Sequence, residues 1–172
     1  MEAFTLIHVA ISLAGILSGF IVLLGLFTAK RLDGWTALFL ATTAATSVTG
    51  FFFPFHGLTP AIGVGIISLL ALTVAIFTRY ARHLAGAWRK AYVISAMLAL
   101  YLNVFVLVVQ TLLKIPALKA IAPNQTEPPF LITQLSVLML FIALGTVAIF
   151  RFRSEQVGPW DPLNHVQAIH PS

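Results

Sequence analysis

The chain has 172 residues, of which 59% are hydrophobic and only 9% are charged, and its formal net charge is +5. Soluble domains place about a quarter of their residues in the charged class, so this composition excludes an ordinary water-soluble fold and predicts a protein that faces lipid. The basic excess does not indicate nucleic-acid binding, because the Lys and Arg residues lie beside long apolar runs, where they would contact lipid headgroups. The chain has no cysteine, which excludes disulfides, thiolate metal sites and iron–sulfur clusters.

The gaps between charged residues predict an all-α integral membrane bundle of five transmembrane helices. A helix that crosses the hydrocarbon core needs about 20 apolar residues, and three charge-free runs have that length. The run 34–78 is about twice as long, so it must fold back, and Pro54, Gly57 and Pro60 mark the hairpin. The predicted spans are 4–29, 35–54, 59–78, 91–113 and 130–150, which form one domain, 1–153, followed by a polar tail, 154–172.

The positive-inside rule orients these predicted spans. Eight of the ten Lys and Arg residues fall in the first loop, the third loop and the start of the tail, which share one face of the membrane. The opposite face has only Lys114 and Lys119. We therefore expect the N-terminus outside and the C-terminus in the cytoplasm, in a multi-pass protein of a bacterial inner membrane.

Polar side chains collect in the outer half of the predicted bundle. Without water, such groups should face one another, a cavity or a ligand. On the second span, Thr43, Ser47 and Gly50 share a face that could approach the same centre. The five candidates for a site are His8, His56, Asn103, Gln110 and Gln134.

The same residues are compatible with ordinary helix packing, in which polar side chains bond across helices. No Asp or Glu lies within any predicted span, which disfavours proton-coupled transport. No nucleophile stands with a base and an orienting acid, so the sequence leaves open whether the protein is an enzyme.

Three functions remain as hypotheses. The first is an accessory or assembly subunit that binds partner membrane proteins or further copies of itself through its small-residue stripes. The second is a redox or metal-binding protein in which His8 and His56 ligate a b-type haem or a copper ion. The third is a binding protein for a lipophilic molecule such as a quinone, with Asn103, Gln110 and Gln134 as hydrogen-bond partners and the phenylalanines of 51–55 as a wall.

The outer loop 114–129 is rich in proline and apolar residues. Such a segment is expected to lie along the membrane surface instead of projecting into water. The sequence leaves open whether the loop acts as a lid over the outer site.

Overall fold

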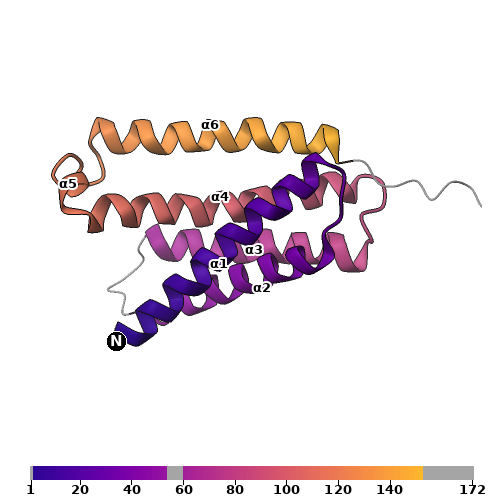
Figure 1. The fold of residues 1–172 in the computed structure, drawn as a ribbon, viewed down its shortest axis with the longest axis horizontal. Coiled ribbons are helices and arrows are strands. Elements are labelled where there is room, and N and C mark those ends of the chain that lie inside the picture. The colour runs from indigo at the N-terminus through magenta and orange to yellow at the C-terminus, as the bar shows by residue number, and fades with distance from the viewer. Residues whose placement is uncertain (1, 54–59, 153–172) are drawn as a thin grey trace, which may run out of the picture.

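The computed structural model describes residues 2–53 and 60–152, which are helical throughout, with turns and no strand in those ranges (Figure 1). The prediction of an all-helical protein is therefore confirmed for the described part of the chain. A π-helical turn, Phe77–Ala81, extends the third helix. The α-helices are α1 (Glu2–Phe27), α2 (Asp33–Gly50), α3 (Pro60–Ile76), α4 (Trp88–Lys114), the short α5 (Pro116–Lys119) and α6 (Pro128–Arg151).

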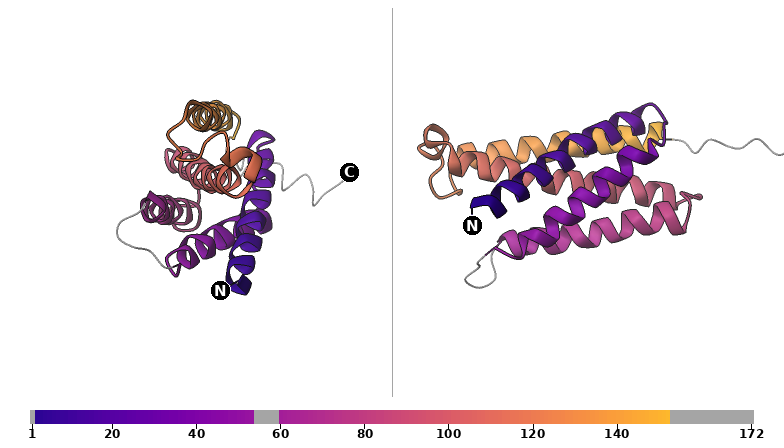
Figure 2. Two further views of the ribbon diagram at one scale, coloured as in Figure 1. Left: turned by 90° about the vertical axis from the view of Figure 1, so that its left-hand side faces the viewer. Right: turned by 60° about the horizontal axis from the view of Figure 1, so that its bottom comes forward.

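The long helices run between the same two ends of the molecule, and α4 lies at the centre of their packing. It contacts α1, α2, α3 and α6, whereas α6 lies along the side of α4 away from α3 (Figures 1 and 2). The N-terminus of α1, the end of α2, the start of α3 and α5 share one end of the bundle, here called the polar end. The loops 28–32 and 82–87 and the end of α6 lie at the other, here called the basic end.

Four helices are long and apolar enough to cross a membrane, which indicates a multi-pass membrane protein. The fifth long helix, α2, is less apolar because it begins with Asp33 and carries several Thr and Ser side chains. That α2 crosses the membrane therefore stays a prediction. The predicted hairpin and the tail fall on residues 54–59 and 153–172, outside the described part. The four apolar helices are Glu2–Phe27, Ala61–Ala81, Trp88–Lys114 and Pro128–Arg151.

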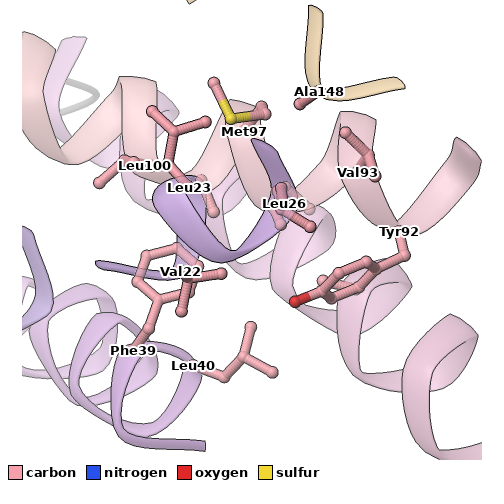
Figure 3. Close-up of a cluster of buried hydrophobic side chains, with 14 of the residues drawn as sticks. Val22, Leu23, Leu26, Phe39, Leu40, Tyr92, Val93, Met97, Leu100 and Ala148 are labelled. Carbon is pink, nitrogen blue, oxygen red and sulfur yellow. The ribbon is translucent and has the colours of Figure 1, made fainter. Parts of the chain in front are cut away.

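The core lies where α1 meets α2 and α4, and side chains of α3 and α6 also contribute to it (Figure 3). Phe39, Tyr92 and Leu100 are each at most 2% exposed. Gly19 of α1 permits this close approach, because a Cβ atom there would lie 2.5 Å from Leu100 Cδ1 and 3.0 Å from the Phe39 ring. Small residues at helix contacts of this kind are characteristic of membrane bundles.

Arg79 ties three helices together at the basic end. Its guanidinium donates hydrogen bonds to the Asp33 carboxylate and, at 2.9 Å, to the carbonyl of Arg31. The same group lies 5.3 Å from the centre of the Tyr92 ring, within the range of a cation–π contact. The Arg79 side chain is 4% exposed, so these contacts compensate a charge that is withdrawn from water.

Glu127 organises the end of the outer loop. Its carboxylate accepts hydrogen bonds from the backbone N–H of Asn124, the backbone N–H of Thr126 and the Asn124 side-chain amide, at 3.0 to 3.2 Å. Partial desolvation opposes ionisation, but these hydrogen bonds and one from its own backbone outweigh it, so the pKa of Glu127 is lowered from 4.5. The loop is therefore held by a carboxylate that stays ionised at neutral pH.

Replacement of Gly19 by Leu should destabilise the bundle by about 1–3 kcal/mol, because the added side chain would overlap the tightly packed Leu100 and Phe39. Thermal unfolding in detergent measures the change. Gly63→Leu is the matched control, since a Cβ atom at Gly63 meets nothing within 4 Å. Equal stability of the two variants would contradict the close approach of α1 to α2 and α4.

The carboxyl carbon of Glu127 should titrate with a midpoint below 4.5, and Asn124→Ala should raise that midpoint because it removes one donor. A lowered pKa in the folded state means that the contribution to stability is present above the unfolded-state pKa and is lost as pH falls through the folded value. Carbon-13 NMR of Glu-labelled protein measures the midpoint, with Glu127→Gln to assign the signal. A midpoint unaffected by Asn124→Ala would refute the role of the side-chain amide.

Candidate functional site

A cavity of about 710 Å³ opens at the polar end, between α1, α2, α3 and α4. Its walls are mostly apolar and include Leu13, Val64, Val106 and Leu107. No carboxylate lines it among the residues that the structure describes, and Lys114 at the end of α4 is the one charged side chain in its described lining. The polar lining residues are Thr5, His8, Ser12, Thr46, Ser47, Ser68, Asn103, Gln110, Thr111 and Lys114.

His8 enters this cavity from the second turn of α1. Its side chain is half-buried, and its Nδ1 atom lies 2.8 Å from Oγ1 of Thr49 on α2. The Phe53 ring packs edge-on against the imidazole, with 5.0 Å between ring centres and 82° between planes. These contacts fix the orientation of the ring in the cavity wall.

Asn103 enters from α4 and is buried. Its side-chain amide donates a hydrogen bond of 3.1 Å to Oγ1 of Thr43 on α2. Gly15 of α1 makes room for this pair, because a Cβ atom there would lie 3.2 Å from Thr43 Oγ1 and 3.5 Å from Asn103 Nδ2. Asn103 thus joins α2 to α4 and also lines the cavity.

Hydroxyl groups form one side of the cavity between α2 and α3. Ser47 and Ser68 are hydrogen-bonded to each other at 2.9 Å, and both are buried. The neighbouring hydroxyl of Thr46 is buried and has no hydrogen-bond partner among the described residues. Two hydroxyls that share one bond keep one proton free to donate, so this side of the cavity can donate hydrogen bonds to a ligand.

The structure brings together three of the five candidate residues, His8, Asn103 and Gln110. Gln134 does not line the cavity, because α6 packs on the far side of α4. Its amide donates instead to the carbonyl of Phe105, at 3.3 Å. His56 lies outside the described residues, so the pairing of His8 with His56 stays a prediction.

Of the phenylalanines of 51–55, the structure describes three, and two of them line the cavity. Phe51 and Phe53 line the cavity, whereas Phe52 is 72% exposed. Of the outer loop 114–129, only Lys114 and Ile115 line the cavity, and the short helix α5 follows directly after them.

Sequence reasoning missed Thr46, Thr49 and Ser68 as members or supports of the site. The signal was present on α2, where Thr42, Thr46 and Thr49 recur at helical spacing. Threonine in an apolar helix is usually satisfied by its own backbone, so nothing in the sequence distinguished Thr46 from the others.

The arrangement can bind a small molecule through apolar contacts and neutral hydrogen bonds. Among the residues that the structure describes, no three His, Cys, Asp or Glu side chains gather as a metal site would need. An apolar cavity with a few convergent neutral polar groups is typical of sites for small lipophilic molecules.

Comparisons with protein-family models, curated proteins and solved structures found no match. The geometry of the cavity is therefore the basis for a functional assignment.

Proposed function

We propose that this protein binds a lipophilic small molecule in the cavity at its polar end. The observation that carries the proposal is the cavity itself, which has about 710 Å³ of mainly apolar space. His8, Asn103 and several hydroxyl groups line its walls. Its volume falls in the range of known ligand sites, about 300–1,000 Å³. Apolar walls would hold the body of the ligand, and the neutral polar groups would orient its polar head.

We further propose that all five long helices cross the bilayer, with the N-terminus outside and the C-terminus in the cytoplasm of a bacterial cell. The described loops with most Lys and Arg residues lie together at the basic end, which supports a cytoplasmic location for that end. Helix α2 has 18 residues, about 27 Å at 1.5 Å per residue, which is close to the thickness of the hydrocarbon core. The cavity then opens on the outer side.

The role of accessory subunit has no observation that favours it over lipid contact. The exposed apolar side chains of α6, such as Leu131, Leu135 and Phe150, are those expected of a helix that faces lipid. Binding to partner subunits or further copies stays a prediction, which co-purification in mild detergent would test.

Haem or copper ligation also stays a prediction, since its second ligand, His56, lies outside the described residues. His8 alone supplies one imidazole to the cavity. A Soret absorption band that disappears in His8→Ala would support haem in place of an organic ligand.

The topology predicts which cysteine variants an impermeant maleimide can label in intact cells. The natural chain has no cysteine, so each variant gives a clean background. Phe52→Cys, at the end of α2, and Lys114→Cys should be labelled from outside, whereas Lys30→Cys should react only after permeabilisation. Labelling of Phe52→Cys and Lys30→Cys from the same side of the membrane would contradict a membrane-spanning α2.

Filling the cavity should weaken binding of the ligand. Val106→Trp adds an indole to the cavity wall on α4, so the affinity for tritiated para-nonylphenol in nanodiscs should fall at least about tenfold. Val147→Trp on α6 is the matched control, because Val147 is 43% exposed and lies outside the cavity lining. Binding that survives Val106→Trp unchanged would place the ligand elsewhere and refute the proposed site.

A further inference from the structure

We infer that the cavity selects molecules that donate a hydroxyl proton, such as phenols or hydroquinones, and that Thr49 sets this selectivity by fixing the tautomer of His8. The inference rests on the proposed function and specifies its class of ligand. The direction of the ligand's hydrogen bond is the opposite of that expected for a quinone, because quinone carbonyl oxygens only accept hydrogen bonds.

The Thr49 hydroxyl already donates its proton to a backbone carbonyl of its own helix. Its Oγ1 atom lies 2.7 Å from the carbonyl oxygen of Ala45 and 3.2 Å from that of Thr46. A carbonyl oxygen can only accept, so an oxygen–oxygen separation of 2.7 Å requires the threonine proton between the two atoms. Thr49 is therefore an acceptor toward any third partner.

That third partner is Nδ1 of His8, at 2.8 Å. Because Thr49 can only accept there, Nδ1 must carry a proton and donate it. A neutral imidazole has one N–H group, so Nε2 is left with a lone pair and no proton. No hydrogen bond joins Nε2 to any described residue.

The neutral form is the one that this cavity accommodates. A charged imidazolium away from water needs a counter-ion, and no described carboxylate lines the cavity. The charged side chain that does line it, Lys114, is itself a cation. His8 therefore presents an acceptor to the cavity, not a donor.

A ligand hydroxyl can donate its proton to His8 Nε2 and so satisfy the acceptor that His8 presents. Its oxygen, or a second oxygen on the same ring, can accept the proton that the Ser47–Ser68 pair keeps free between α2 and α3. A carbonyl ligand would instead set one lone pair against another at His8.

A matched pair of ligands tests the selectivity in the full-length protein. Para-nonylphenol carries the donor, and para-nonylanisole replaces that proton with a methyl group on the same ring and tail. We expect the phenol to bind about tenfold more tightly to protein in phosphatidylcholine nanodiscs, with binding to empty nanodiscs subtracted, since one neutral hydrogen bond is at stake. Equal affinities, or tighter binding of the ether, would overturn the inference but not the proposed function.

Thr49→Val removes the acceptor for Nδ1 without altering the cavity lining, to which Thr49 does not belong. The ratio of phenol to ether affinity should fall toward one, while the affinity for the ether stays unchanged. Thr49→Ser keeps the hydroxyl and should keep the ratio. Thr73→Val is the matched control, because Thr73 bonds only its own helix, at the carbonyl of Leu69, and is exposed.

Nitrogen-15 NMR of histidine-labelled protein tests the tautomer without any ligand, with His8→Ala to assign the signal. We expect a proton on Nδ1 of His8, and a shift toward the Nε2-protonated form in Thr49→Val. A proton on Nε2 in the natural protein would overturn the inference, as would iron bound to that atom. If neither probe binds, the proposed function itself fails, whatever the tautomer.

Discussion

Hydrocarbon offers no hydrogen bonds, and this constraint accounts for the arrangement of nearly every described hydroxyl group in the bundle. Most Ser and Thr side chains donate to the carbonyl four residues earlier in their own helix, which satisfies them without any partner. Such residues are compatible with lipid at almost any position. They are Ser18, Thr28, Thr42, Thr49, Thr73, Thr78, Ser95, Thr111, Thr133 and Thr146.

The buried hydroxyls that do not follow this pattern mark the places where α2 meets its neighbours. Thr43 accepts from Asn103 on α4, and Ser47 bonds to Ser68 on α3. Thr46, between them, is buried without a described partner. Thr43, Ser47 and Ser68 therefore join helices to one another, and Thr46 is one of the polar residues that line the cavity.

Much of the fold was predictable from the sequence because it depends on where charge is absent. Long apolar runs between charged residues specify α1, α4 and α6, whereas α3 also needed the prolines and glycine of the predicted hairpin to divide the run 34–78. Helix α2 is harder to predict, since its threonines lower its apolar character while its packing against α1 and α3 compensates. The average polarity of a sequence segment does not show which of its hydroxyl groups are hydrogen-bonded to the backbone of their own helix.

The candidate site was predictable only in part, for a geometrical reason. Depth in the membrane follows from position along a helix, so His8, Asn103 and Gln134 could all be placed in the outer half. Which helices are neighbours does not follow from depth. Gln134 lies on α6, which packs on α4 away from the cavity, whereas Thr49 reaches His8 because α1 and α2 pack along each other.

The contacts that hold the helices together lie at the basic end and along the walls of the cavity. At the basic end, Arg79 joins the extension of α3 to the start of α2 and lies over Tyr92 of α4. Nearer the middle, the Ser47–Ser68 and Thr43–Asn103 bonds tie the same three helices. These contacts fix the walls of the cavity before any ligand arrives, so little binding energy need be spent on ordering them. The same walls keep His8 next to Thr49, whose hydroxyl proton is donated to Ala45, and this contact is the basis of the preference for hydroxyl donors that we propose.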